Sequence, residues 1–267
     1  STVEQRVLAA LTVAALDDAG VTVEARTGLG GTVGLRREAL GGEIDLFWDH
    51  TGAAWALGLG QEAPPADPEE SFERVRRADE EHGLVWLPPS RANATLALFV
   101  REESLPPRQE PRGMEWLAGV LSRGEGTLCA DPDFISRPGG LEALAEAYAM
   151  DLDRVEHVAA PEEEAIEGVA SGRCFAGLAT ATSGAARAAG LVPVSDDLRV
   201  FPAFVAAPVV RADALARVPA VASALERVTE RLNTPTLARL NALVEEGADP
   251  AVVAEEVLAD DAVVPAD

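Results

Sequence analysis

Apolar and polar positions along the chain follow two periods, one helical and one extended. An opening helix up to Gly20 is predicted, because Thr2 stands three residues before Gln5 in the spacing of a capping box and a helical apolar face follows. That face is formed by Val7, Leu8, Leu11 and Leu16.

Short apolar runs bounded by turn residues alternate with further helical segments. Strands are predicted at 21–25, 44–48, 84–89, 94–100, 127–130, 154–158 and 173–180 and within the extended stretch 199–211. Helices are predicted at 69–82, 114–122, 140–149, 161–170, 212–232, 234–246 and 249–258, with short ones before Gly41, from Thr51 and from Ser183. This alternation predicts an α/β protein with mostly parallel sheets.

Two segments share one sequence pattern: the end of a helix and a glycine, then an apolar strand, then a Thr-Gly or Ser-Gly pair. They are EALGGEIDLFWDHTG at 38–52 and GVASGRCFAGLATATSG at 168–184. One copy in each half predicts two lobes, with a cleft at the carboxyl ends of their strands.

Charge excludes some partners. The chain has 267 residues and a formal net charge of −23, which repels phosphate backbones and anionic lipid headgroups, so nucleic acid is not expected as a partner. No apolar run approaches the roughly 20 residues that a membrane-spanning helix needs.

The cysteines and histidines do not form a metal-binding pattern. Cys129 and Cys174 lack CxxC spacing, and the histidines lie far apart at 50, 82 and 157. We therefore expect no metal and no cofactor. Each cysteine lies in an apolar strand-like run, which favours buried free thiols; a disulfide would require that the two strands be neighbours.

No catalytic constellation is present. Carboxylate pairs such as Asp45 and Asp49 carry little information in so acidic a chain, and there is no Gly-x-Ser-x-Gly elbow, metal triad or Cys/His pair. The glycine-rich turn TGLGGT at 27–32 lacks the Lys-Ser/Thr of a phosphate-binding loop. The sequence predicts a protein that is not an enzyme.

The segment GEIDLFWDHTG at 42–52 is unusual, because from Ile44 onward it places two aromatic residues, two acids and a histidine where a strand meets a loop. In order along the chain, TVEQRVLAAL, TGLGGT, LGGEIDLFWDHTG, HGLVWLPPSRANATLALFVR, RPGGLEALAEAY and FPAFVAAPVVR resemble the substrate-binding proteins of osmoprotectant ABC transporters. That family takes up glycine betaine, choline, carnitine and related quaternary ammonium compounds.

The resemblance implies a two-lobed, type II periplasmic-binding-protein-like clamshell. Lobe one would comprise 1–98 plus 205–267 and lobe two 99–204, with hinges near 99–100 and 204–205. The first strand of lobe one is apparently absent, because family members carry a strand ahead of the Thr-x-Glu-Gln helix. The implied partners are a small-molecule solute and ABC permease subunits, and the implied location is extracytoplasmic, lipid-anchored or secreted, with a leader upstream of Ser1.

Family members enclose the quaternary ammonium in a cage of tyrosines. At the matching positions this chain has His50, Leu96 and Thr180, while Phe204 keeps a ring without the hydroxyl. Each aromatic face contributes roughly 0.5–2 kcal/mol to binding a cation. The sequence therefore predicts weak or no binding of choline and glycine betaine.

We expect the ligand-binding residues in the cleft to combine these positions with nearby polar groups and helix N-termini. They are Gln5, Thr27, Gly28, Trp48, Asp49, His50, Thr51, Leu96, Thr180, Thr182 and Phe204. The predicted function is a solute-binding protein of an ABC importer for a small polar or quaternary-ammonium solute. The alternative is a ligand-sensing or interaction domain that keeps the fold without serving transport.

Overall fold

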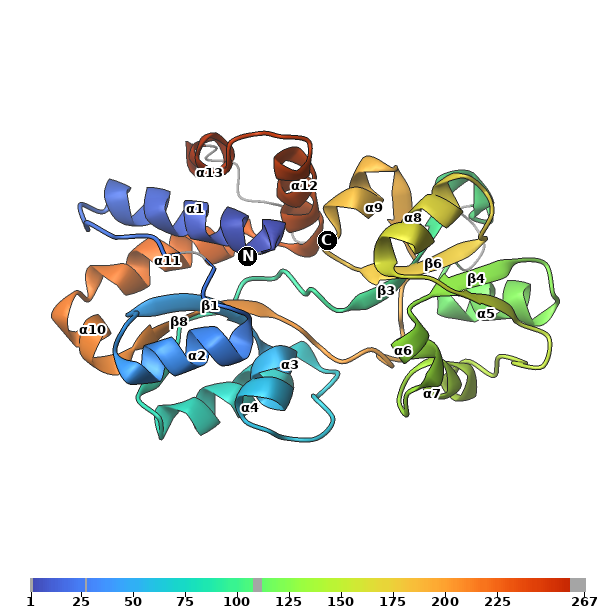
Figure 1. Ribbon diagram of the computed structural model, residues 1–267, viewed down its shortest axis with the longest axis horizontal. Coiled ribbons are helices and arrows are strands. Elements are labelled where there is room, and N and C mark those ends of the chain that lie inside the picture. Colours follow the sequence, from blue (N-terminus) through green and yellow to red (C-terminus); the bar gives the residue numbers. More distant parts are fainter. Residues whose placement is uncertain (1, 27, 108–111, 260–267) are drawn as a thin grey trace. The chain divides into compact units, whose positions relative to one another are not determined.

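The protein forms two compact units, labelled by element in Figure 1. The computed structural model describes residues 2–26, 28–107 and 112–259. Unit 1 comprises the described residues up to Ala94 and from Pro202 onward, and unit 2 comprises those from Thr95 to Phe201. The hinges expected at 99–100 and 204–205 stay a prediction.

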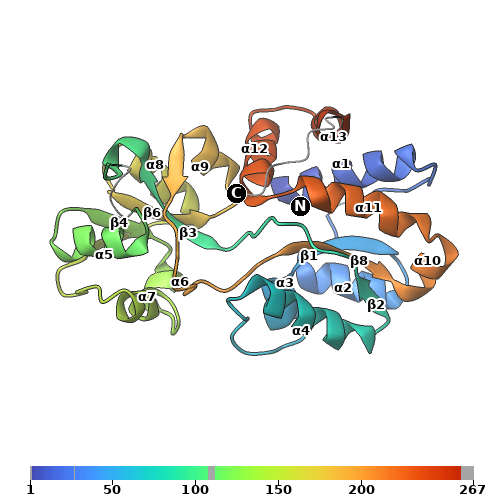
Figure 2. The same ribbon diagram turned by 180° about the vertical axis from the view of Figure 1, so that it is seen from behind.

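Unit 1 is a three-stranded sheet between two layers of helices (Figures 1 and 2). Its strand order is β1-β8-β2. Its elements are α1 (Val3–Asp18), α2 (Thr32–Gly41), β1 (Leu46–His50), α3 (Thr51–Ala53), the π-helical turn η1 (Ala54–Gly58), α4 (Pro68–Glu80), β2 (Leu84–Trp86), β8 (Ala206–Arg211), α10 (Ala212–Arg217), α11 (Ala220–Arg231), α12 (Thr234–Glu245) and α13 (Pro250–Ala259).

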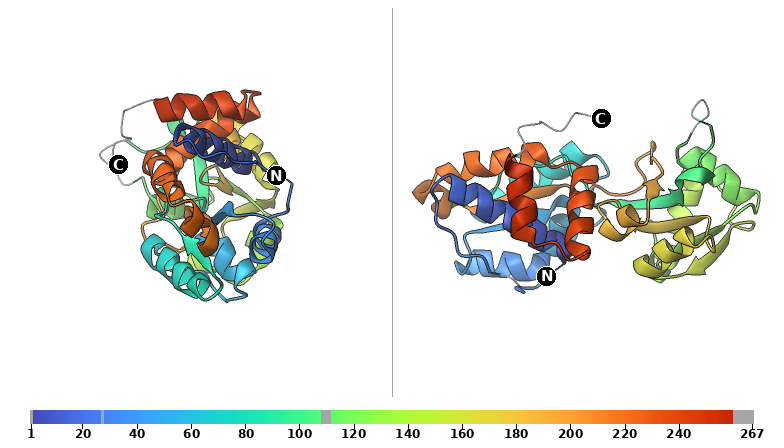
Figure 3. Two further views of the ribbon diagram at one scale, coloured as in Figure 1. Left: turned by 90° about the vertical axis from the view of Figure 1, so that its left-hand side faces the viewer. Right: turned by 90° about the horizontal axis from the view of Figure 1, so that it is seen from above.

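The two faces of this sheet bury different cores. Helices α1, α11, α12 and α13 pack together on one face, where α1 is the blue helix among the orange and red ones in Figure 3. Helices α2 and α4 cover the other face. Phe47 and Trp48 are consecutive in β1 and enter opposite cores, so both serve the fold, as the alternation of a strand between two helix layers requires.

One expected strand of unit 1 does not form. Residues 21–26 form no strand and join neither of the two sheets. A cavity of about 360 Å³ lies between them and β1, lined also by residues of α1. The prediction for 21–25 is therefore wrong: Val21 and Val23 pack against the core, but the cavity separates the segment from β1, so the two form no hydrogen-bond ladder.

The edge of β1 that faces this cavity has a testable consequence. Arg211 N donates to Asp45 O at 2.9 Å and Thr51 N to Val205 O at 3.0 Å, so the main chain of Leu46 and Trp48 faces away from β8. We expect the amides of Leu46 and Trp48 to exchange hydrogen faster than those of Phe47 and Asp49, since only the latter pair donates into the sheet. Amide exchange followed by NMR tests this, and equal protection of all four amides would contradict it.

Unit 2 is a five-stranded sheet with the order β5-β4-β6-β3-β7. Helices α8 and α9 pack on one face, while α5, α6 and α7 pack on the other. Its elements are β3 (Leu96–Arg101), the 3-10 turn η2 (Glu102–Ser104), α5 (Met114–Ser122), β4 (Thr127–Ala130), α6 (Pro132–Ser136), α7 (Leu141–Ala147), β5 (Glu156–Ala159), α8 (Glu162–Ala170), β6 (Ala176–Thr180), α9 (Gly184–Ala188) and β7 (Leu191–Pro193).

The α/β class is confirmed, but the expectation of mostly parallel sheets is wrong. β4 pairs in parallel with β5 and β6, whereas β8 is antiparallel to β1 and β2, and β3 is antiparallel to β6 and β7. The reason is that β3 and β8 each follow directly where the chain enters a unit. They are not the second strand of a strand–helix–strand crossover, which is the connection that makes neighbours parallel.

The predicted helix 212–232 is two helices, α10 and α11. Pro219 cannot donate a backbone N–H, and the preceding Val218 has an extended conformation (φ −134°, ψ 75°), so the first helix ends before the proline.

No helix within residues 2–26, 28–107 and 112–259 is long and apolar enough to span a bilayer.

The interpretation of the cysteines as free thiols is also wrong. Cys129 in β4 and Cys174 just before β6 form a disulfide with their Cα atoms 5.9 Å apart. The two are brought together because β4 and β6 are adjacent and parallel, with Cys129 opposite Gly177. Both cysteines are fully buried, so the bond lies inside the core of unit 2.

Candidate functional site

The end of β1 places a histidine between two layers of unit 1. Successive side chains of a strand point to opposite faces, and Trp48 and His50 point toward α1 while Asp49 points toward α2. Trp48 Nε1 donates to Thr12 Oγ1 at 2.8 Å, and His50 Nε2 lies 2.7 Å from Glu4 Oε1. Thus α1 fixes both side chains, and His50 is the one at the strand end.

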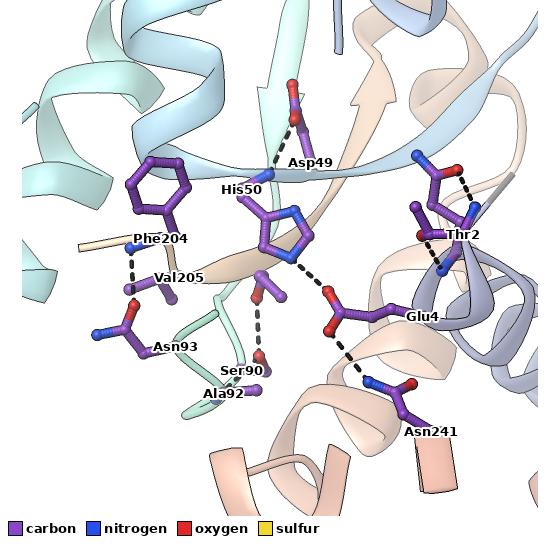
Figure 4. Close-up of polar contacts among 12 residues, drawn as sticks. Thr2, Glu4, Asp49, His50, Ser90, Ala92, Asn93, Phe204, Val205 and Asn241 are labelled. Carbon is purple, nitrogen blue, oxygen red and sulfur yellow. Dashed lines mark hydrogen bonds and ion pairs between the residues drawn. The ribbon is translucent and has the colours of Figure 1, made fainter. Parts of the chain in front are cut away.

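The His50 ring is held by an acid, as Figure 4 shows. Its side chain is 22% exposed and that of Glu4 14%. Burial is the largest single influence on the ring and opposes protonation, but the hydrogen bond and charge of Glu4, with the charge of Asp49, outweigh it and raise the pKa of His50. Glu4 Oε2 also accepts from Asn241 Nδ2 of α12 at 3.2 Å, so three elements converge here.

Asp49 is directed away from this histidine, into the layer of α2. It is 3% exposed, and its Oδ1 accepts from Thr32 Oγ1 at 2.8 Å and from His50 N at 2.9 Å. Burial raises the pKa of Asp49, although both hydrogen bonds act in the opposite direction. These contacts tie β1 to the first turn of α2.

Thr51 and Gly52 join β1 to the segment that contains Phe204. Thr51 is fully buried; its Oγ1 accepts from Val205 N at 3.1 Å and from Ser71 Oγ at 2.8 Å. Phe204 N donates to Asn93 Oδ1 at 2.7 Å. His50, Thr51 and Phe204 are therefore brought together in unit 1 (Figure 4), and Phe204 is half-buried.

Gly52 lies directly against the Phe204 ring. A Cβ on Gly52 would lie 2.7 Å from Ala203 O and 2.8 Å from Phe204 Cε2. We expect Gly52→Ala to lower the free energy of unfolding by about 1–3 kcal/mol, because the backbone carbonyl cannot move aside. Urea denaturation measures this change.

Gly41→Ala is a suitable control, since a Cβ there meets nothing within 4 Å and alanine stabilises a helix relative to glycine. Equal stability of wild type and Gly52→Ala would contradict the expected overpacking.

The other positions that the resemblance matches to the family's cage lie in unit 2. Leu96 and Thr180 face each other across the β3–β6 ladder. Thr180 donates through N at 3.1 Å and through Oγ1 at 2.9 Å to Glu162 Oε2 in the first turn of α8. Thr182 is buried. A half-buried carboxylate, Glu162, is therefore the neighbour of Thr180 at the carboxyl end of β6.

The other predicted site residues either have a role in the fold of unit 1 or lie outside the residues that the structure describes. Gln5 completes the capping box of α1 by accepting from Thr2 N at 3.2 Å. Gly28 has a φ of +76°, which glycine adopts readily. Gln5, Gly28 and Trp48 line the cavity beside β1. Thr27 lies outside the described residues, and a ligand contact by any of these four stays a prediction.

The sequence did not reveal three polar neighbours of the predicted residues, namely Glu4, Asn241 and Glu162. Glu4 precedes Gln5 in the capping-box segment, and its place beside a predicted site residue is the sequence signal that could have pointed to it. Asn241 is separated from Glu4 by 237 residues, so no local pattern links the two.

Comparison with known proteins gives a consistent result. The family model described as the substrate-binding domain of ABC-type glycine betaine transport systems matches residues 1–260. A glycine-betaine-binding protein of Pseudomonas aeruginosa is 34% identical over 266 residues, covering 96% of this chain and 84% of that protein.

Two further proteins extend the similarity to structure. The glycine betaine-binding protein YehZ of Escherichia coli is 31% identical over 253 residues, covering 91% of this chain and 82% of that protein. The apo structure of YehZ has a TM-score of 0.86 at 30% identity, covering 96% of this chain and 94% of the other. A solved glycine betaine/carnitine/choline ABC transporter protein shares the fold, with a TM-score of 0.87 at 21% identity over 97% of this chain and 95% of the other.

Proposed function

Since the chain belongs to the family of substrate-binding domains of ABC-type glycine betaine transport systems, we propose that it binds a small zwitterionic or quaternary-ammonium solute and delivers it to ABC permease subunits. The observation that carries this proposal is the family match over residues 1–260, together with relatives named as glycine betaine-binding proteins. The family and these relatives are binding proteins, and we propose that this chain likewise has no catalytic activity.

We propose an extracytoplasmic location. The buried Cys129–Cys174 disulfide supports it, because such bonds persist in oxidising compartments and are rare in the cytosol. A lipid anchor at the cell surface, and enclosure of the solute between the two units, are proposals that rest on the resemblance alone.

The proposed affinity for a quaternary ammonium is low. Of the four cage positions, only Phe204 carries an aromatic six-membered ring, and His50, Leu96 and Thr180 do not. Each missing face removes roughly 0.5–2 kcal/mol of cation–π attraction. Polar groups would have to hold the solute instead, and His50 and the amide of Asn93 are such groups beside Phe204.

Calorimetric titration with glycine betaine, choline, carnitine, proline and ergothioneine tests the proposal. We expect weak but saturable binding of at least one zwitterion or quaternary ammonium. A solute at 100 times its Kd adds about 2.7 kcal/mol to stability, so a shift in the melting temperature of several degrees should accompany it. Absence of both signals for every solute would contradict the proposed solute class.

A variant sharpens this test. His50→Tyr restores one aromatic face, so we expect choline to bind roughly 2- to 30-fold more tightly, equivalent to about 0.5–2 kcal/mol. His82→Tyr is the matched control, because His82 follows the end of α4 and its side chain is 46% exposed. Equal choline affinity in wild type and His50→Tyr would show that position 50 does not face the solute.

A further inference from the structure

One ring nitrogen of His50 has a hydrogen-bond partner among the described residues, and the other is open, that is, without one. Nε2 is paired with Glu4 Oε1 at 2.7 Å, whereas Nδ1 has no hydrogen-bond partner within the part of the chain that the structure describes. The side chain is 22% exposed, so solvent or a solute reaches the ring. The open nitrogen is therefore the atom of the His50 ring that is available to a ligand.

Glu4 is fixed as the partner of Nε2. It lies in the first turn of α1, where the helix dipole favours a negative charge. Its second oxygen accepts from Asn241 Nδ2 at 3.2 Å, so the carboxylate is oriented from two sides (Figure 4). An ionised carboxylate that accepts a hydrogen bond keeps a proton on Nε2 in both charge states of the ring.

This arrangement makes Nδ1 change its role with protonation. In the imidazolium both nitrogens donate; in the neutral ring with its proton on Nε2, Nδ1 is an acceptor with a lone pair. The ionisable groups around the ring are Glu4 from α1 and Asp49 from β1, while β8 places only Ala206 opposite. Both acids favour the charged ring, which donates from Nδ1.

We propose that His50 is the residue that determines solute specificity in unit 1, and that Glu4 and Asn241 are positioning residues for it. The site then takes a solute that presents an anionic oxygen, such as a carboxylate, to Nδ1–H. A solute that is only a cation is disfavoured by the charged ring. This inference rests on the proposed function. The proposed function leaves open whether the solute carries a carboxylate, and the inference specifies that it does.

The pH dependence follows from the sign of the protonation step. A carboxylate solute binds the protonated ring, so its affinity is full below the pKa of His50 and falls as pH rises through it, by up to about tenfold per pH unit. Glu4 and Asp49 raise that pKa above its ordinary value of 6.5, so the decline is expected on the alkaline side of that value. A cationic solute without a carboxylate should show the opposite slope.

The test is calorimetric titration of the full chain with glycine betaine and choline from about pH 5.5 to 8.5, for wild type and three variants. We expect the affinity for glycine betaine to fall as pH rises through the pKa of His50 in wild type, by up to about tenfold per pH unit above it. His50→Gln should remove the pH dependence, and Glu4→Gln should move it to lower pH. His82→Gln, at an exposed position just after the end of α4, should behave as wild type.

A second readout separates positioning from a purely structural role. The chain has three histidines, so the imidazole NMR signal of His50 is identified as the one missing from His50→Gln. Its titration midpoint should fall in Glu4→Gln and stay unchanged in His82→Gln. An unchanged midpoint in Glu4→Gln overturns the assigned role of Glu4.

The two proposals fail in different ways. Glycine betaine binding with the same pH profile in wild type and His50→Gln overturns this inference and leaves the proposed function intact. No binding of glycine betaine, choline, carnitine, proline or ergothioneine by wild type at any pH overturns both.

Discussion

Reduction of the Cys129–Cys174 disulfide is expected to lower the free energy of unfolding of unit 2 by about 4 kcal/mol. The bond closes a loop of 45 residues, and the chain-entropy relation for a loop of that length gives about 4 kcal/mol at 25 °C. Both cysteines are fully buried between β4, β6 and α8, so the effect should fall on the cooperative unfolding of unit 2 as a whole.

Urea denaturation with and without a strong thiol reductant measures this loss. The reductant must be present during unfolding, because the buried bond is protected in the folded state. The double variant Cys129→Ala/Cys174→Ala should be insensitive to the reductant, since these are the two cysteines of the chain. A wild-type midpoint that does not move under reducing conditions would contradict the expected stabilisation.

Asp79→Ala is expected to lower the free energy of unfolding of unit 1 by about 3–5 kcal/mol. Asp79 of α4 accepts from Arg36 Nη1 of α2 at 2.9 Å and from Trp86 Nε1 of β2 at 2.7 Å. The side chains of Arg36 and Asp79 are 8% and 1% exposed. Removal of the carboxylate leaves a buried guanidinium without its counter-charge and a buried indole N–H without its acceptor.

Two comparisons test this reasoning by denaturant unfolding. Glu70→Ala, also in α4, removes an ion pair with Arg74 in which both side chains are 51% exposed, and should cost less than about 1 kcal/mol. The double variant Arg36→Met/Asp79→Leu should recover much of the loss, because an apolar pair leaves no buried charge. A single Asp79→Ala variant as stable as Glu70→Ala would show that the pair is dispensable.

Much of the local structure follows from the sequence because it depends on neighbours along the chain. The capping box of Thr2 and Gln5 forms as its spacing predicts. The Thr-Gly and Ser-Gly pairs both lie at the start of a helix, as their pattern predicts: Thr51 begins α3 directly after β1, and Ser183 caps α9. The same holds for β4, found at Thr127–Ala130 as its apolar run predicts.

Elements that depend on a distant partner were not predictable in the same way. Residues 21–25 have the alternation of a strand, but a strand forms only where a neighbour supplies its hydrogen bonds, and none does here. The run at 127–130 does not reveal whether its cysteine is free, because only the adjacency of β4 and β6 brings Cys174 to it.

The candidate site divides along the same line. The sequence by itself placed His50 just after a strand predicted at 44–48, and the family resemblance implies a tyrosine where His50 stands. Only the tertiary structure decided the protonation and hydrogen bonding of the His50 ring. Both depend on Glu4, which is 46 residues away, and on Asn241, which is 237 residues from Glu4. Charge and hydrogen bonding act through space over a few ångströms, whereas a sequence pattern records only distance along the chain.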